Sequence, residues 1–235
     1  SGSDAYEGSE EYPLQTVEAA LALYRKNPSP GGTTILLREG IYVLSEPLVL
    51  TYRDRQPVTF LSYPGERPVI SGENRVIGWT KVEWQGRLVW SAALNLRQIP
   101  RALYGDDGAR RLAAWPKEGT LSVTYTLPTD AEDPASETQA RHRAFYANPA
   151  DIPISLEGAI VRMLHLWKDE LTGVSLYDPA TGRVSLNRRT SMTVSPGDRY
   201  WFENVLHAPL SPGEWAYDQA SGTLYYAPLP GETPE

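Results

Sequence analysis

Residues 33–79 decide the fold and read TTILLREGIYVLSEPLVLTYRDRQPVTFLSYPGERPVISGENRVIGW. Short apolar and β-branched runs alternate in this stretch with turn-forming pairs such as Glu39-Gly40 and Pro64-Gly65. Runs this short, interrupted this often by Gly and Pro, are typical of strands and not of a buried helix. The predicted strand segments are Thr34–Leu37, Ile41–Leu44, Leu48–Leu50, Val58–Leu61 and Val69–Ile70.

The turns between these segments do not predict hairpins. No Asn-Gly or Asp-Gly pair joins one segment to the next, and such pairs are the strongest signal for a two-residue hairpin loop. Each turn redirects the chain instead, which suits a coil that winds and stacks its strands in parallel. Val58–Leu61 follows Ile35–Leu37 by about one coil, within the repeat length of solenoids. The stretch therefore predicts the opening coils of a parallel β-solenoid.

An amphipathic helix is predicted directly before this stretch. Leu14, Val17, Leu21 and Tyr24 recur at helical spacing, and the turn-rich residues 27–32 end the pattern. The first coil of a solenoid exposes unpaired backbone and an open apolar core, which something must cover. We therefore interpret the helix as a cap and assign it no catalytic role.

After Trp79 the turns become typical of antiparallel hairpins. Asp107-Gly108 suits a tight hairpin, and Leu156–Trp167 has the alternation of a strand. LYDPATGRVSL (residues 176–186) and AYDQASGTLYY (residues 216–226) are near-copies of one turn. In each copy the Asp can accept hydrogen bonds from the backbone ahead of it, and the Gly can adopt the left-handed conformation. These features predict an antiparallel β-sandwich.

The predicted domain plan has three parts. Residues 1–78 hold the capping helix and first coils, residues 79–205 an inserted β-sandwich, and residues 206–235 the return to the solenoid. Within the sandwich, Thr126–Asn148 is rich in Asp, Glu, Thr and Ala, and we expect a long excursion loop there.

Bulk composition excludes several classes of function. The chain has 235 residues, of which 41% are hydrophobic, and its net charge is −7. A nucleic-acid backbone is bound by clustered Lys and Arg, whereas the basic clusters here are no larger than Arg110-Arg111 and Arg188-Arg189. No apolar run is long enough to span a bilayer. We therefore expect neither a nucleic-acid partner nor a membrane partner.

Cysteine is absent, and the 19 Gly and 20 Pro outnumber the two Met. The absence of cysteine excludes thiol nucleophiles, zinc–thiolate sites and disulfides. High Gly and Pro content is typical of a loop-rich β protein. No starting Met or signal peptide precedes Ser1, so we interpret the chain as a processed or trimmed piece.

Several stretches, in this order, resemble a known family. They are GSDAYEG before the helix, LLREGIYVLSEPLVL, FLSYPGERPVISG, PRALYGDDGARRLAAWP, LHLWKDELTGVSLYDPATGRVSL and YWFENVLHAPLSPGEWAYDQASGTLYYAP. Together they resemble the N-terminal part of right-handed parallel β-helix (pectate-lyase-like) glycoside hydrolases. The sequence is similar to the bacterial β-xylosidase and α-fucosidase/xylanase kinds.

The resemblance implies a fold and a function. It implies an all-β chain whose helix caps the first coils of a right-handed parallel β-helix, with a β-sandwich inserted after them. In these families the catalytic carboxylates lie on later coils, beyond the point that matches Tyr226–Pro228, so no residue here inherits those roles. The resemblance thus implies a secreted or periplasmic enzyme that acts on plant-type polysaccharide, and a segment of it that is inactive alone. Two alternatives stay open: a free-standing carbohydrate-binding module, and a small self-contained hydrolase or lyase.

Local carboxylates offer a weak case for catalysis. Glycoside hydrolysis needs two facing carboxylates roughly 5–10 Å apart. The candidate pairs are Asp106/Asp107, Asp130/Asp133, Asp169/Glu170 and Asp178/Asp218, of which Asp107, Asp178 and Asp218 are most simply turn residues. Residues 130–137 could supply oxygen ligands to calcium but lack the Gly and the alternating spacing of a calcium loop. We expect no metal and no other cofactor.

Aromatic and basic side chains are the better candidates for contact with an oligosaccharide or polysaccharide. The chain has seven Trp and 14 Tyr, whose flat faces can stack on sugar rings, although most are expected to pack in the core. Histidine is scarce, and His165 lies between apolar residues, which also suits a neutral, hydrogen-bonded boundary histidine. The solenoid edge also predicts self-association. The predicted carbohydrate contacts are Arg110, Arg111, Trp115, His165 and Trp167.

Overall fold

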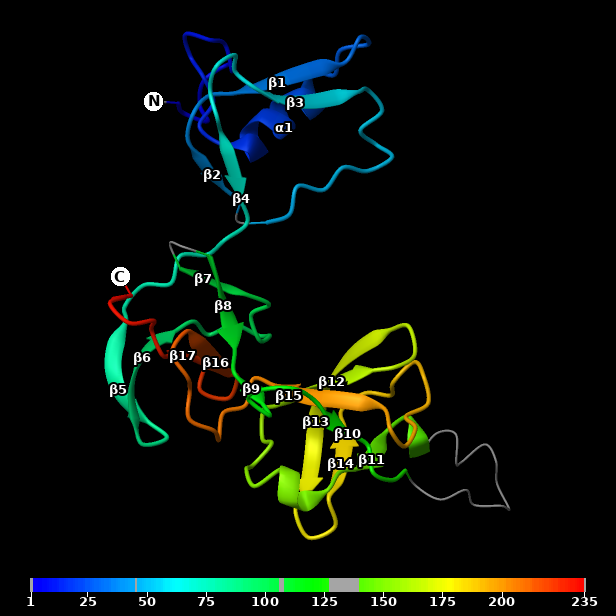
Figure 1. Cartoon of the computed structure of the whole chain (residues 1–235). Helices are drawn as coiled ribbons and strands as arrows, with labels where there is room; N and C mark the ends of the chain where they lie inside the picture. Colours follow the sequence, from blue (N-terminus) through cyan, green and yellow to red (C-terminus); the bar gives the residue numbers. More distant parts are fainter. Residues whose placement is uncertain (1, 45, 106–107, 127–139, 235) are drawn as a thin grey trace. The chain divides into compact units, whose positions relative to one another are not determined.

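The computed structural model describes residues 2–44, 46–105, 108–126 and 140–234 (Figure 1). The chain divides into two compact units, Ser1–Arg75 and Val76–Glu235. Strands dominate both units, and the α-helix whose bounds lie within the described residues is α1 (Val17–Lys26). The prediction of an all-β class is therefore confirmed.

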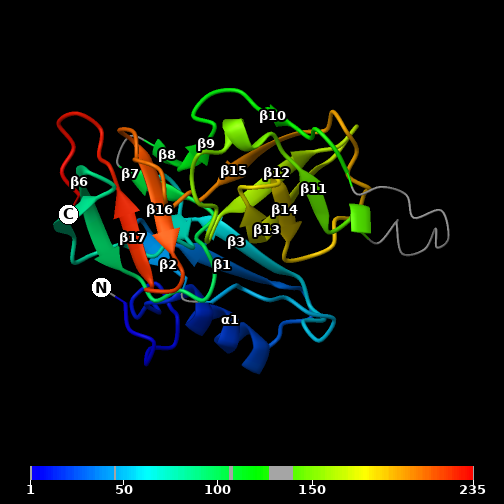
Figure 2. The same ribbon diagram turned by 90° about the horizontal axis from the view of Figure 1, so that it is seen from below.

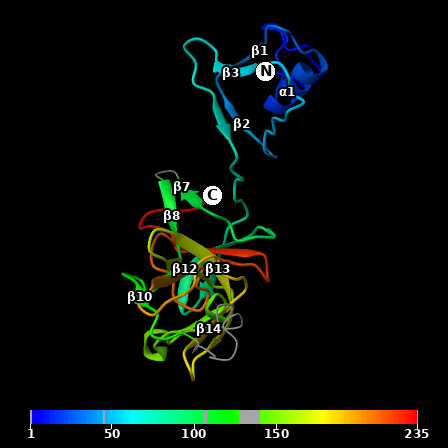
Figure 3. The same cartoon turned by 90° about the vertical axis from the view of Figure 1, so that its right-hand side faces the viewer.

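The predicted helix forms where the sequence provides a cap. The side chain of Thr16 accepts a hydrogen bond from the backbone N–H of Ala19 at 3.1 Å, which satisfies one of the free donors of the first turn. Val17, Leu21 and Tyr24 are buried, as their spacing predicts. Figure 3 shows α1 lying beside β1 and β3 of the same unit, so the apolar face of the helix covers these strands.

The first unit contains two parallel strand pairs. β1 (Thr33–Leu37) pairs with β3 (Val58–Ser62), and Thr33 stands opposite Val58, 25 residues later. β2 (Ile41–Val43) pairs with β4 (Val69–Ser71), and Ile41 stands opposite Val69, 28 residues later. The predicted parallel stacking of these segments is confirmed.

The predicted strand Leu48–Leu50 is wrong, because these residues lie outside any strand. Val49 is 58% exposed and Leu50 is 52% exposed. The carbonyl of Val49 accepts a hydrogen bond from the Arg25 side chain of α1 at 2.6 Å. The Arg25 side chain thus occupies the carbonyl of Val49, which would otherwise accept a hydrogen bond from a neighbouring strand.

The second unit contains two larger sheets, mostly antiparallel, that are β-sandwich-like (Figures 1 and 2). The six-stranded sheet has the order β5-β6-β17-β16-β8-β7, and the other has the order β10-β15-β12-β13-β14-β11 with β9 paired to β15. The strands of the first sheet are β5 (Thr80–Trp84), β6 (Arg87–Ala93), β7 (Leu103–Gly105), β8 (Gly108–Leu112), β16 (Glu214–Asp218) and β17 (Thr223–Tyr226). Those of the second are β9 (Ala114–Trp115), β10 (Leu121–Ser122), β11 (Ala144–Tyr146), β12 (Ile160–Leu164), β13 (Asp169–Asp178), β14 (Arg183–Leu186) and β15 (Arg199–Glu203).

The strands within residues 206–235 belong to the six-stranded sheet. β17 pairs with β6, while β16 pairs with β8 in parallel and with β17 as a hairpin. Figure 2 shows β16 and β17 side by side in this sheet. In this sheet Trp215 and Tyr217 form one buried cluster with Leu224 and Tyr226. The return of residues 206–235 to the solenoid stays a prediction.

Apolar clusters hold each sheet of the second unit together. Phe145, Tyr200 and Phe202 lie in the core of the seven-stranded sheet, and neighbouring rings among them pack edge to face with centroids 4.8 and 5.4 Å apart. Burial raises the pKa of Tyr200 well above its ordinary range, so its hydroxyl stays protonated.

The two near-copies of one turn form as predicted. Asp178 accepts a hydrogen bond from the backbone N–H of Ala180, and Asp218 accepts one from Ala220, each at 2.9 Å. Gly182 has φ +75°, and Gly222, at the same position of the second turn, has φ +68°. Both turns therefore use the aspartate acceptor and the left-handed glycine that the sequence pattern indicates.

Gly182→Ala is expected to lower the free energy of unfolding by about 2 kcal/mol, because a left-handed alanine costs about 1 kcal/mol and its Cβ would overlap the carbonyl oxygen of Ala147. Gly197 is the matched control, since it has φ +90° with nothing near its Cβ position. Gly197→Ala should cost only about 1 kcal/mol. Urea denaturation measures both, and equal losses would contradict the packing argument.

Candidate functional site

The predicted contacts on β8 have partners within the protein. The Arg110 side chain is 6% exposed, and it donates hydrogen bonds to the Tyr226 hydroxyl at 2.6 Å and to Glu232 at 2.8 Å. Burial and the Glu232 carboxylate raise the pKa of Tyr226 to about 12. Arg111 is half exposed and donates to the carbonyl of Lys117 at 2.7 Å.

Trp115, on β9, is only partly buried. It packs against the core of the seven-stranded sheet, and its indole N–H donates to the carbonyl of Asp151 at 2.8 Å. This packing covers part of the ring that a ligand would otherwise contact. The role of Arg110, Arg111 and Trp115 as sugar contacts stays a prediction, and the structure gives each of them an internal partner.

His165 and Trp167 lie together in the turn between β12 and β13. The backbone N–H of His165 donates to the carbonyl of Lys168 at 2.8 Å, which closes the turn. Within it, Leu166 is 86% exposed and Trp167 is 81% exposed. An exposed tryptophan adds little hydrophobic stabilisation to the fold, because its large apolar surface stays in water. The turn therefore presents an aromatic face that a ligand can cover.

The base of this turn is buried and polar. The His165 side chain is 2% exposed, with Nδ1 3.3 Å from Oδ2 of Asp198 and Nε2 3.5 Å from Oε2 of Glu170. Nε2 makes no hydrogen bond to a described residue. The carboxylate of Glu170 accepts hydrogen bonds from the backbone and hydroxyl of Ser191 at 2.8 and 3.0 Å. Although burial opposes it, these bonds hold the pKa of Glu170 below its ordinary value.

Among the described residues, each candidate carboxylate has a partner of its own. Asp169 forms an ion pair with Arg162 at 2.5 Å, whereas Glu170 faces His165 and Ser191. Asp178 and Asp218 cap their turns. The pairs Asp106/Asp107 and Asp130/Asp133, and the acidic loop 130–137, lie outside the described residues. In the described ranges, no cluster of three or more His, Asp or Glu could hold a metal ion.

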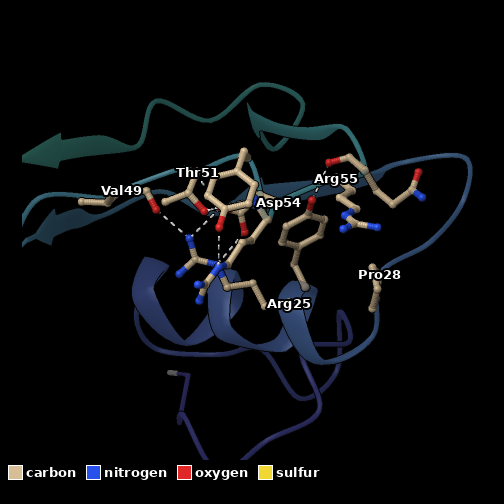
Figure 4. A pocket seen from close by; sticks show the side chains of 10 residues that line it. Arg25, Pro28, Val49, Thr51, Asp54 and Arg55 are labelled. Carbon is tan, nitrogen blue, oxygen red and sulfur yellow. Dashed lines mark hydrogen bonds and ion pairs between the residues drawn. The ribbon is translucent and has the colours of Figure 1, made fainter.

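The first unit has a cavity that was not predicted from the sequence (Figure 4). It lies between the end of α1 and the segment 49–56, and its volume is about 750 Å³. The sequence signal is the run TYRDR at residues 51–55, in which one tyrosine precedes three consecutive charged residues. The lining residues are Tyr24, Arg25, Pro28, Val49, Thr51, Tyr52, Arg53, Asp54, Arg55 and Gln56.

An ion pair fixes the shape of this cavity. Arg25 donates to Asp54 from Nε at 2.7 Å and from Nη2 at 3.0 Å, and the backbone N–H of Thr51 donates to the same carboxylate at 2.7 Å. The Arg25 guanidinium, followed by the Thr51 hydrogen bond, lowers the pKa of Asp54 to about 2. The Tyr24 hydroxyl also donates to the carbonyl of Gln56. The loop is thus tied to the helix at both ends.

The chain shares its fold with a solved structure described as a glycoside hydrolase. The two are 19% identical with a TM-score of 0.72, and the match covers 99% of this chain and 43% of that one. The fold is therefore glycoside hydrolase-like. Among curated proteins, the chain is similar to "Uncharacterized protein YwoF" of Bacillus subtilis (strain 168), with 36% identity over 74 residues. That match covers 32% of this chain and 15% of the relative.

The chain spans less than half the length of each of these proteins. No protein-family model matches it. In the parts of the chain that the structure describes, no helix has the length and apolar character needed to cross a bilayer.

Proposed function

We propose that this chain is the carbohydrate-associated N-terminal segment of an extracellular β-helix glycoside hydrolase, secreted or periplasmic, that acts on plant-type polysaccharide. The parallel pairing of β1 with β3 and of β2 with β4 supports winding as a right-handed β-helix. The fold shared with a chain described as a glycoside hydrolase supports the same origin. In this proposal the catalytic carboxylates belong to later coils, and this chain alone does not hydrolyse its ligand.

The proposed organisation follows from the same argument. Residues 1–78 form the capping helix and first coils, residues 79–205 form the inserted β-sandwich, and the chain returns to the solenoid within residues 206–235, after β17. Ile41, Val43 and Val69 on the paired strands β2 and β4 are each more than half exposed. Further coils would cover these side chains, and without such coils the open edge favours self-association.

One observation carries the carbohydrate assignment: Trp167 is 81% exposed on a turn whose base is fixed by buried His165. A sugar ring presents C–H groups on one face, and a rigid aromatic ring is the apolar surface they need. Because the turn is anchored, stacking costs little additional ordering of the protein. Trp167 is therefore the proposed platform, and His165 is the residue that positions it.

Trp167→Ala is expected to weaken binding of a soluble polysaccharide about tenfold, which corresponds to about 1.4 kcal/mol. The measurement is affinity electrophoresis in gels that contain xylan, pectin or a fucosylated glycan, with the thermal midpoint recorded to check the fold. Tyr104→Ala is the matched control, because Tyr104 is a 58% exposed aromatic residue on β7. If the Trp167→Ala variant is retarded in the gel as strongly as wild type, Trp167 is not the sugar-binding platform. Release of reducing sugar by this chain would contradict the proposal that it is inactive alone.

A further inference from the structure

The cavity beside α1 is basic. Three of its lining residues are arginines, and Asp54 is the acidic residue among them. The whole chain carries a net charge of −7, so this surface differs in sign from the molecule as a whole. A concave surface with excess positive charge attracts anions.

Internal contacts neutralise one arginine. Arg25 binds Asp54 through two hydrogen bonds, and the Asp54 side chain is 7% exposed. Asp54 is therefore committed to Arg25 and shielded from other cations. Figure 4 shows this pair in the middle of the lining, with Arg55 set apart from it.

The other two arginines are not neutralised. Nε of Arg53 donates to the Tyr52 hydroxyl at 3.4 Å, which is an uncharged partner. The exposed Arg55 side chain forms no hydrogen bond or ion pair with any residue that the structure describes. A guanidinium presents a planar fork of N–H donors that matches a carboxylate in a bidentate manner. The cavity thus offers two donor groups without an acidic partner among the described residues.

An aromatic ring stands next to these donors. Tyr52 is 82% exposed, and Cζ of Arg53 lies 5.7 Å from the centroid of its ring. A ring of this kind can stack on the C–H face of a sugar, while a guanidinium beside it binds a carboxylate on the same sugar. The combination selects a ligand that is both flat and anionic.

We propose that this cavity binds a carboxylate-bearing sugar, a uronic acid residue of an acidic polysaccharide, with Arg53 and Arg55 as ligands of the carboxylate and Tyr52 as the stacking surface. The assignment rests on the proposed carbohydrate function and adds the charge of the ligand to it. Arg25 and Asp54 are positioning residues, because they fix the loop that carries the three ligand residues.

The test is calorimetric titration of the whole chain with an oligogalacturonate, an uncharged xylo-oligosaccharide and inorganic phosphate. Arg55→Gln is expected to weaken oligogalacturonate binding at least tenfold and to leave binding of the uncharged sugar unchanged. Tyr52→Ala should also weaken oligogalacturonate binding, because it removes the stacking surface. Arg67→Gln is the control of equal charge, since Arg67 is an exposed arginine of the same unit outside this cavity.

Each outcome decides the proposal. If oligogalacturonate binds the Arg55→Gln and wild-type chains equally, the carboxylate site is wrong. If inorganic phosphate binds the chain as tightly as oligogalacturonate does, the cavity is a general anion site and the assignment of a sugar ligand is wrong. If Arg55→Gln loses oligogalacturonate binding while Trp167→Ala binds every polysaccharide as wild type does, the cavity site is supported and the Trp167 platform is refuted. If Trp167→Ala weakens polysaccharide binding while Arg55→Gln binds oligogalacturonate as wild type does, the platform is supported and the cavity site is refuted.

Discussion

Asn204→Ala is expected to lower the free energy of unfolding of the second unit by about 3 kcal/mol. Asn204 follows β15 and is 1% exposed. Its Oδ1 accepts from the backbone N–H of Tyr217 at 2.8 Å, and its Nδ2 donates to the carbonyls of Gly158 and Tyr217, each at 3.0 Å. One side chain therefore satisfies three backbone groups, two of them on the buried Tyr217, and ties the seven-stranded sheet to β16 of the other sheet.

The size of this effect follows from what alanine leaves behind. Each buried backbone group without a partner costs about 1–3 kcal/mol. Asn204 also has φ +54°, a conformation that asparagine tolerates and alanine does not, which adds about 1 kcal/mol. Partial relaxation offsets some of the sum, because the freed backbone groups can find water.

Two variants separate the hydrogen bonds from the backbone strain. Asn204→Gly keeps the left-handed conformation and removes the amide, so its loss should be smaller than that of alanine by about 1 kcal/mol. Asn204→Asp keeps the acceptor and removes both donors. Urea denaturation followed by tryptophan fluorescence reports on the second unit, because all seven Trp lie after Arg75. An alanine variant within 0.5 kcal/mol of wild type, an order-of-magnitude bound for a neutral surface change, would refute the argument.

Local signals were sufficient for the parallel stacking and for the twin turns. The segments in residues 33–71 are short and β-branched, and their turns lack hairpin pairs, so parallel pairing was the remaining solution. In the turns, each Asp and Gly acts on its own neighbours within four residues. Because these contacts form between residues close in the sequence, they can be predicted from the local residue types alone.

Contacts between distant residues could not be predicted in the same way. Leu48–Leu50 has the composition of a strand, but Arg25, 24 residues before it, binds the carbonyl of Val49. Arg110 follows a turn as an exposed residue would, yet its partner Glu232 is 122 residues away. The cavity beside α1 has the same origin, since Arg25 and Asp54 are 29 residues apart. The periodicity of apolar residues, on which the strand and helix predictions rest, does not indicate any of these pairings.

The exposed turn of the second unit shows where residue type does and does not decide a role. His165 and Trp167 were both predicted as carbohydrate contacts. Burial separates their roles: the His165 side chain is 2% exposed, whereas Trp167 is 81% exposed. A polar ring with two nearby carboxylates can be buried at this position, while the larger apolar ring is left in water. The sequence indicated the location, and the fold assigned the roles.

Lys117→Met is expected to destabilise the second unit by about 3 kcal/mol, more than Glu214→Gln does. Nζ of Lys117 lies 2.6 Å from Oε2 of Glu214, whose side chain is 3% exposed. The same carboxylate also accepts from the backbone N–H of Ser211 at 2.8 Å. Removing the lysine leaves a buried carboxylate without its cation, which costs about 3–5 kcal/mol in comparable pairs.

The converse variant should be milder, because the two partners are buried to different extents. Glu214→Gln keeps an acceptor for Ser211, and Lys117, which is 30% exposed, can turn to water, so the expected loss is about 1–2 kcal/mol. The double variant Lys117→Met/Glu214→Gln should lose less than the two single losses together, since no charge is left buried without a partner. Urea denaturation of the three variants measures this coupling. Additive losses, or a Glu214→Gln variant less stable than Lys117→Met, would show that burial of the carboxylate does not set the energy of the pair.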